Sequence, residues 1–442
     1  MKTPIFDFLN EYRKSDTARL HMPGHKGRGE LGVERYDITE IDGADNLFSP
    51  IGIIAESEEN AARLFGTQKT LYSTEGATLA IKAMLAIVAK GKKKARILAT
   101  GASHKAFMYA AALLDLDVDF IYPKDTVSVC VGDVAAQQIE DTLDRFSYDA
   151  VYITSPDYLG NIADIRGIAQ ACHKSGIPLL VDNAHGAYLK FLSPSRHPID
   201  LGADMCCDSA HKTLSALTGT AYLHISKSAP AEYSDSARDM LALFASTSPS
   251  YLLLASLDIC NKNLAANYSV RLADTIKTLD GIKRNLLANN ISVADTEPLK
   301  IVIEANKIGY TGTAIADILR KSGIECEFSD SEYTVMMITP ENSLEELKRA
   351  EEALLSIKKL PPLKLEERVL GDIKREYKMS IREALFMPSE EILVSHSIGR
   401  ICAAPTVSCP PAIPIAVSGE VIKTEMIPYF LKYGIEKIKV VK

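Results

Sequence analysis

Two hydrophobic patterns alternate between residues 67 and 225 of the chain. Short runs that are nearly continuous in apolar residues are separated by segments with helical spacing, such as TLAIKAMLAIVAK (78–90) and KAFMYAAALL (105–114). The strand-like runs are KTLYST, RILAT, AVYITS, PLLVDN, ADMCCDS and TAYLHIS. Apolar strands joined by helices of about 10 to 15 residues indicate a mostly parallel sheet covered on both faces. The pattern therefore predicts an α/β domain.

A smaller unit follows a long helical stretch that runs from about residue 260 to about 290. Its order is strand KIVIEA, helix TAIADILRKSG, strands ECEFS and YTVMMIT, and helix SLEELKRAEEALLSIK, an α+β arrangement. Ser343 and Glu346 have the spacing of a capping box. Beyond the joint at 360–362, the Pro-, Gly- and Ser-rich stretch CPPAIPIAVSGE (409–420) favours an ordered loop over a regular helix.

The length of the chain agrees with more than one hydrophobic core. At about 150 residues per domain, 442 residues suggest two or three domains. The patterns divide the chain into an N-terminal arm (1–47), a large domain (48–265), a small α+β domain (266–362) and a C-terminal segment (363–442).

Composition excludes several classes of protein. The formal charge of -7, with no Lys/Arg-rich face carrying aromatics, argues against binding to nucleic acid. The start of the chain has no apolar signal region, and no run approaches 18 uncharged apolar residues, so export and membrane spanning are not expected. The sequence therefore predicts a cytoplasmic protein that does not bind membranes.

No metal site is predicted. The eight cysteines include no CxxC pair and are expected to be reduced and mostly buried. His21 and His25 have i,i+4 spacing, but Pro23 and Gly24 between them prevent the helix that a zincin-type site needs.

Polar residues follow the predicted strands directly, at 75–78, 103–104, 182–185 and 208–212. Ligands of parallel sheets bind beyond the carboxyl ends of the strands. Lys212 is the most informative residue, because a lysine in a loop of small residues is poorly placed either to increase solubility at the surface or to pack in the core. Burial lowers a lysine pKa, and a neutral amine is the nucleophile that forms a Schiff base with pyridoxal phosphate.

That cofactor makes further demands on the sequence. Asp182, 30 residues before Lys212, could keep the pyridine nitrogen protonated, and His185 follows where the backbone passes the ring. His104 could stack on the open face of the ring. The phosphate needs helix-terminal amides and side-chain donors, for which the candidates are Gly76, Ala77, Thr78, Ser209 and His211. Alone, each residue has an ordinary structural explanation as a cap, turn or satisfied histidine.

Together these residues resemble a known family. LHMPGHKG (20–27), DITE (37–40), VDNAHGA (181–187), DSAHKTLSALTG (208–219), TSPSYLLLASLD (247–258), GRICAA (399–404) and CPPAIPIAVSGE are similar to the ornithine/lysine/arginine decarboxylases. The likeness is to their short form, which lacks the N-terminal wing domain, and it covers residues 20 to about 420. It implies fold type I of the pyridoxal phosphate enzymes, with a mostly parallel, seven-stranded large-domain sheet.

The resemblance also implies a reaction: a basic L-amino acid loses CO2 and leaves as the amine, as in polyamine biosynthesis. Lys212 would hold the cofactor as a Schiff base, Asp182 its pyridinium, and Lys212 or His185 would protonate Cα. Thr247 or Ser248 would reach the phosphate of a partner subunit, which implies a homodimer or higher oligomer with shared sites. The HMPGHKG arm would pack near the site, or else is only a Pro-Gly turn.

Several positions depart from the family pattern. Asn183 stands where Glu is common, Glu75 and Ala77 alter an Asn-Gly-Ser-Thr phosphate loop, and Ala404 and Ser418 replace a Glu and a Pro in the tail. Glu75 would oppose a phosphate dianion unless it points away. Two alternatives therefore stay open beside decarboxylation: another fold type I activity, such as an aminotransferase or lyase, and a catalytically weak regulatory homologue. A scaffold without cofactor is a third alternative, and the choice among arginine, lysine and ornithine is open.

Overall fold

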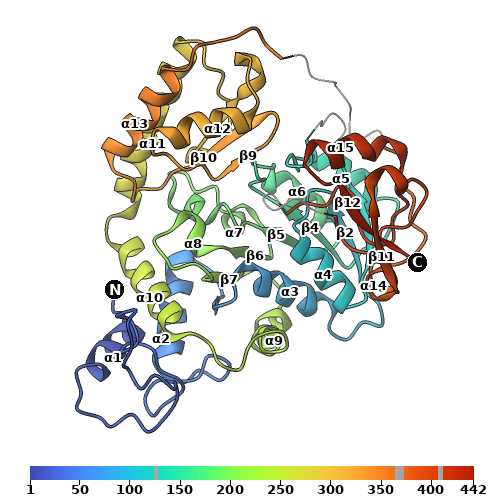
Figure 1. Cartoon of the computed structure of the whole chain (residues 1–442). Coiled ribbons are helices and arrows are strands. Elements are labelled where there is room, and N and C mark those ends of the chain that lie inside the picture. The colour runs from blue at the N-terminus through green and yellow to red at the C-terminus, as the bar shows by residue number, and fades with distance from the viewer. Residues whose placement is uncertain (124–127, 364–372, 407–411) are drawn as a thin grey trace. The chain divides into compact units, whose positions relative to one another are not determined.

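The structure is a computed structural model that describes residues 1–123, 128–363, 373–406 and 412–442 (Figure 1). The chain divides into two compact units. The first comprises Met1–Lys92, Asp149–Val151 and Ile165–Val270, and the second comprises Lys93–Tyr148, Tyr152–Asp164 and Arg271–Lys442. The sequence-based boundaries at 47, 265 and 362 follow other criteria and stay a prediction.

Four strands of the first unit pair in the order β1 (Lys69–Ser73), β7 (Ala221–Ile225), β6 (Met205–Asp208) and β5 (Leu179–Asp182). β5 and β6 are parallel, whereas β7 runs antiparallel to both β6 and β1. Every residue of β5, β6 and β7 is buried. This burial explains why these runs are apolar apart from Asp182, Asp208 and His224 and lack an alternation of apolar and polar residues.

The complete sheet has seven strands in the order β1-β7-β6-β5-β4-β2-β3. Its other members are β4 (Ala150–Thr154), β2 (Arg96–Thr100) and β3 (Asp117–Ile121), and β2 and β3 pair in parallel. The expected α/β class with a mostly parallel sheet is confirmed. Strand β3, DVDFI, was not predicted from the sequence, because its acidic residues alternate with apolar ones and most of it is only half-buried.

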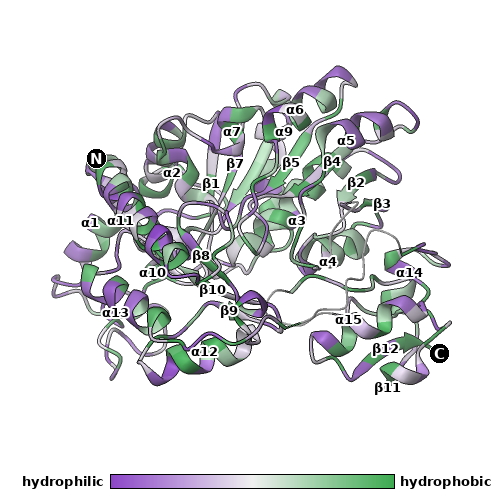
Figure 2. Cartoon of the chain, turned by 90° about the horizontal axis from the view of Figure 1, so that it is seen from above, coloured by the Kyte–Doolittle hydropathy of each residue, from purple (hydrophilic) through white to green (hydrophobic). Residues whose placement is uncertain are grey.

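Helix α3 (Gly76–Ala89) packs on β1, β5, β6 and β7 and against α9 (Ala231–Ala242). Ten of its fourteen residues are buried, and the helix is coloured as largely hydrophobic in Figure 2. A helix that is apolar on most sides must lie between layers. Its N-terminus, with the predicted phosphate-binding residues, therefore has a fixed position relative to the carboxyl ends of β5 and β6.

The remaining helices of the first unit include short ones that begin directly after strands or loops. They are α1 (Pro4–Tyr12), α2 (Ile53–Phe65), α6 (Ile165–Lys174), α7 (Pro198–Leu201), α8 (Ala210–Thr213) and α10 (Tyr251–Ala266). Helix α11 (Tyr268–Ala288) begins in the first unit and ends in the second. The long helical stretch expected near 260–290 is thus two helices, with Asn267 between them.

The second unit holds the predicted α+β elements. Strands β8 (Lys300–Glu304), β10 (Tyr333–Met337) and β9 (Phe328–Ser329) form an antiparallel sheet, and α12 (Gly312–Lys321) packs on β10, β9 and α13 (Leu344–Leu355). The capping box of Ser343 and Glu346 is confirmed at the start of α13. Helices α4 (Lys105–Leu113) and α5 (Ala136–Leu143) also belong to this unit.

The C-terminal segment contains more regular structure than its composition suggests. Helices α14 (Ile381–Phe386) and α15 (Ile427–Lys432) and the antiparallel pair β11 (Ser389–Leu393) and β12 (Lys437–Val441) lie on either side of the proline-rich stretch. Residues 412–420 of that stretch are not helical, as expected, and 409–411 lie outside the described residues.

The cysteines of the described ranges agree with the sequence expectation. Six of the seven are buried, Cys326 is half-buried, and none of the seven forms a disulfide within the described ranges. Cys409 lies outside the described residues. Within the described part of the chain, no helix combines the length and the apolarity needed to cross a bilayer.

Asp258 on α10 anchors the N-terminal helix. Its carboxylate accepts hydrogen bonds from the amides of Ile5 and Phe6 at 3.0 and 3.1 Å, and from the Ser57 hydroxyl at 2.6 Å. Burial raises the pKa of Asp258 to about 6, although these three donors oppose the rise. The first turn of α1 is therefore bound to a carboxylate that titrates in a mildly acidic range.

We expect the Asp258→Asn variant to reveal this titration. Because the folded-state pKa exceeds the unfolded one, the contribution of Asp258 to stability is complete below about pH 4 and is lost as the pH rises through about 6. From pH 4 to 7 the wild type should lose on the order of 2 kcal/mol of unfolding free energy relative to the variant. Denaturant titrations at several pH values measure this, with the exposed Asp239→Asn on α9 as control. A pH-independent difference would contradict the assignment.

Candidate active site

Lys212 lies in α8, the short helix that directly follows β6. Its Nζ is 2.9 Å from Nε2 of His185, and Lys212 is half-buried whereas His185 is 6% exposed. A lysine ammonium can only donate hydrogen bonds, so a charged Lys212 requires Nε2 of His185 to carry the lone pair and Nδ1 the proton. The two residues that the sequence proposed as catalytic partners are thus in direct contact.

Asp182 is the last residue of β5 and is 2% exposed. Its Oδ1 accepts a hydrogen bond from the amide of Ala184 at 3.2 Å and a longer one, 3.6 Å, from the thiol of Cys207. Asp182 and Cys207 are register partners in the parallel pair β5–β6, so their side chains lie on the same face of the sheet. The β5 end that carries Asp182 also leads, within three residues, to His185.

Backbone hydrogen bonds connect the start of α3 to the turn that carries Lys212. The amide of Gly76 donates to the carbonyl of Gly219 at 2.7 Å. The next carbonyl, that of Thr220, accepts from the amide of Ala210 at 3.1 Å and from Nδ1 of His211 at 2.9 Å. Since a carbonyl oxygen can only accept, Nδ1 of His211 carries a proton in this contact. The predicted phosphate loop and the lysine turn are therefore neighbours.

Gly76 gives this loop an open approach. Its φ of +67° is in the left-handed region that glycine adopts most easily, and a Cβ placed there would meet nothing within 4 Å. Ala77 is buried and Thr78 is exposed in the first turn of α3. This space beside helix-terminal amides suits an anion.

The concern about Glu75 has a structural answer. Its carboxylate does not cap α3 and instead accepts a hydrogen bond from the amide of Ser246 at 2.6 Å. The acid is thus held by a backbone donor outside the helix terminus. The same contact ties the phosphate loop to the segment that contains Thr247 and Ser248, both of which are exposed.

Two predicted contributions are not brought into this cluster by any contact described above. His104 belongs to the second unit, where it is the N-cap residue of α4 and its Nδ1 accepts from the amide of Ala106 at 3.1 Å. Its stacking on a ring stays a prediction, as does the reach of Thr247 or Ser248 to a partner subunit. Ser209, which is buried, is the N-cap of α8 but makes no capping bond there.

The two histidines of the HMPGHKG arm have separate partners. His21 Nε2 lies 2.6 Å from the hydroxyl of Tyr12, and His25 Nε2 lies 3.1 Å from a carboxylate oxygen of Asp37. Both contacts are made to residues of the N-terminal arm, and whether the HMPGHKG segment packs near the site or is only a turn stays a prediction.

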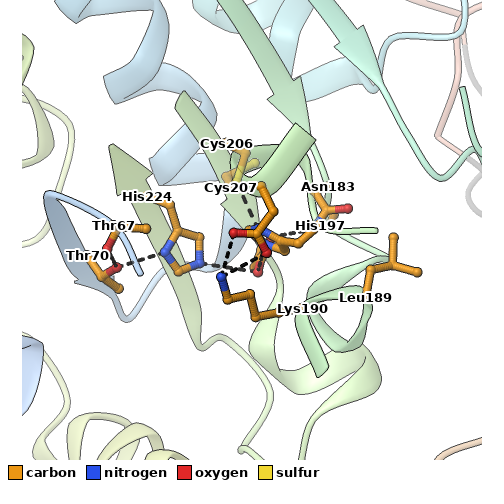
Figure 3. A network of polar contacts seen from close by, with 12 residues as sticks. Thr67, Thr70, Asn183, Leu189, Lys190, His197, Cys206, Cys207 and His224 are labelled. Carbon is orange, nitrogen blue, oxygen red and sulfur yellow. Dashed lines mark hydrogen bonds and ion pairs between the residues drawn. The ribbon is translucent and has the colours of Figure 1, made fainter. Parts of the chain in front are cut away.

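The sequence reading missed a buried polar network at the ends of the same strands. It joins Asn183, His197, Asp208 and His224 (Figure 3). Asn183 was noted only as a departure, and His197 is too far along the chain from the motifs to attract notice. The available signal was a charged residue, Asp208, at the end of an otherwise apolar strand, where burial demands partners.

Comparisons with known proteins agree with the resemblance. The model of the family "Orn/Lys/Arg decarboxylase, major domain" matches residues 3–302. Arginine decarboxylase of Bacillus subtilis is 28% identical over 98% of this chain and 93% of its own length. Arginine decarboxylase of Halalkalibacterium halodurans is 29% identical over 97% of this chain and 92% of its own.

Solved structures support the same fold. Lysine decarboxylase of Francisella novicida superposes with a TM-score of 0.80 over 100% of this chain and 81% of its own, at 17% identity. The constitutive lysine decarboxylase of E. coli gives a TM-score of 0.78 over 100% of this chain and 82% of its own, at 16% identity. The expected family and its class of activity, decarboxylation of a basic amino acid, are confirmed. This chain belongs to the Orn/Lys/Arg decarboxylase family.

Proposed function

We propose that this protein is a pyridoxal phosphate-dependent arginine decarboxylase in which Lys212 holds the cofactor. The observation that carries the proposal is the contact of Lys212 Nζ with His185 Nε2 beside the strand that ends in Asp182. A lysine amine, an imidazole and a buried carboxylate at adjacent strand ends are the groups that this cofactor needs. Other fold type I enzymes share them, so family membership, not this geometry alone, favours decarboxylation.

The residues of the first unit fit the cofactor's chemical groups. Its phosphate would bind at the open approach beside Gly76, with the amides of α3 and the side chains of Thr78, Ser209 and His211 as donors. Asp182 would hold a proton on the ring nitrogen, a role suited to a buried carboxylate at the end of the strand next to the one that leads to Lys212. The placement of Glu75 against Ser246 supports this fit, because the acid does not occupy the anion site.

When bound, pyridoxal phosphate supplies an electron sink for the bond between Cα and the carboxylate. The chain's own residues supply the rest. Lys212 and His185 form a pair that can pass a proton between Nζ and Nε2, and one of them would deliver it to Cα after CO2 has left. Each turnover then takes up one proton and releases CO2 and an amine.

Arginine is our first choice among the basic amino acids. The supporting relatives named arginine decarboxylase match nearly the whole chain at 28–29% identity. The lysine decarboxylase structures share 16–17% identity and speak only to the fold. Glu75 no longer argues for a weak regulatory homologue, because its carboxylate has its own partner.

We also propose that the enzyme works as a cytoplasmic homodimer or higher oligomer in polyamine biosynthesis. Thr247 and Ser248 are exposed on a segment held to the phosphate loop. Such a segment could donate a hydroxyl to a second copy of the chain without refolding. The stacking of His104 on the cofactor ring, which the resemblance implies, is part of the same proposal.

Replacement of Lys212 by alanine should lower decarboxylation about a thousand-fold or more and abolish the visible absorption of the lysine-bound cofactor. The control is Lys227→Ala, an exposed lysine after β7 that should behave as wild type. Absorption spectra and CO2 release measure the two effects. If the Lys212→Ala protein keeps both, the proposed role of Lys212 is wrong.

Substrate choice is tested by offering arginine, lysine and ornithine separately to the wild-type protein with pyridoxal phosphate. We expect agmatine, the product from arginine, to form fastest, since the relatives that match nearly the whole chain are named arginine decarboxylase. Mass spectrometry of the products identifies each amine. A 2-oxo acid as the main product would indicate an aminotransferase, and no CO2 from any of the three would favour the regulatory alternative.

A further inference from the structure

The network around Asp208 lies on the opposite face of the sheet from Asp182. Side chains alternate along a strand, so Asp182 and Cys207 point to one face while the residues that follow them, Asn183 and Asp208, point to the other. The backbone keeps this register, because the amide of Asn183 donates to the carbonyl of Cys207 at 3.0 Å. The side-chain amide of Asn183 then donates to Oδ1 of Asp208 at 2.6 Å.

The second carboxylate oxygen of Asp208 lies within hydrogen-bond distance of two imidazole rings. Oδ2 lies 3.0 Å from Nε2 of His197 and 3.2 Å from Nε2 of His224, and all three side chains are 0% exposed. His224 is oriented from its other side, since its Nδ1 lies 2.8 Å from the hydroxyl of Thr70. The two rings come from different elements, because His224 lies on β7 and His197 is the N-cap residue of α7 (Figure 3).

The contacts of Asp208 favour its charged form. Burial by itself would raise the pKa of Asp208, but its contacts with His197 and His224 hold that pKa well below its ordinary value. Burial lowers the pKa of His224, against the pull of Asp208. A neutral His224 with its proton on Nε2 matches the acceptor at Oδ2 and the donor at Thr70.

A metal ion is the alternative occupant, because the three ligand atoms lie within 4.8 Å of one another. Three features favour a hydrogen-bonded cluster instead. The separations between Oδ2 of Asp208 and the two histidine nitrogens are hydrogen-bond lengths. Oδ1 of Asp208 already accepts a hydrogen bond from the side-chain amide of Asn183. None of the side chains of Asp208, His197 and His224 is exposed.

We propose that Asp208 is a positioning residue for the cofactor site. By gathering Asn183, His197 and His224 on the far face, it fixes the ends of β5 and β6, and so holds Asp182 and the turn from Ser209 to Lys212 on the near face. The inference rests on the proposed function and deepens it. Asn183 is part of this cluster, because Oδ1 of the Asp208 carboxylate faces position 183 and needs a hydrogen-bond donor there.

The pair offers an isosteric exchange as a test. In Asn183→Asp, two carboxylates would face each other at 2.6 Å in a site closed to water. In the double variant Asn183→Asp/Asp208→Asn, the new amide can donate to position 183 while its oxygen accepts from both histidines. Every hydrogen bond of the cluster is then restored with the charge moved to β5. Asp208→Asn alone should also fold, because Oδ1 of Asn183, a buried atom with no partner within the described structure, can turn to accept.

The measurements are the dissociation constant of pyridoxal phosphate and the pH midpoint of the bound cofactor's visible absorption. We expect Asn183→Asp to weaken binding at least about ten-fold and to shift the pH midpoint, since a displaced Asp182 no longer holds the ring proton. The exchanged double variant should return to within about three-fold of the wild type. Ser234→Ala, a buried polar residue on α9, is the control that should change neither value.

Each other outcome overturns the inference. Wild-type affinity and midpoint in Asn183→Asp, with only the unfolding midpoint lowered, would make the cluster purely structural. If Asn183→Asp does not fold, the double variant decides, and its failure to fold or to recover affinity counts against the exchange. About one metal ion per chain, lost in Asp208→Asn, would make the cluster a metal site. A wild type that binds no cofactor would overturn the proposed function as well, whereas a normal wild type with indifferent variants overturns only the role of Asp208.

Discussion

The contact between the amine of Lys212 and the ring of His185 is the interaction on which the rest of the site depends. A lysine is costly to bury, and it is retained only where a partner accepts its protons. Here the partner follows one buried strand and the lysine follows the next. Both residues can be placed to within hydrogen-bond distance only because β5 and β6 are parallel neighbours, whose carboxyl ends meet at one edge.

The two faces of the sheet carry different groups of polar side chains. On one face the strand ends carry Asp182 and lead to His185 and Lys212. On the other, Asp208 takes hydrogen bonds from an asparagine and two histidines that arrive from three elements. A buried carboxylate with only one donor would be unstable, and three donors make its charge tolerable. The same constraint that satisfies Asp208 also limits how far the two strand ends can move.

The sequence predicted this framework well where the physics is local. Strands β5 to β7 are continuous apolar runs, and the capping box of Ser343 and Glu346 is a matter of spacing alone. It could not predict the partner of Glu75, because the amide of Ser246 is 171 residues away in the chain. The cluster at Asp208 was missed for the same reason: His197 and His224 come from separate elements that only the fold brings together.

Family membership is settled by the match over residues 3–302, and the chemistry assigned to it here rests on one covalent attachment. Reduction of the protein with borohydride after incubation with pyridoxal phosphate, followed by peptide mass spectrometry, tests that attachment directly. We expect one modified residue per chain, Lys212. Modification of a different lysine, or none at all under conditions in which the enzyme is active, would contradict it.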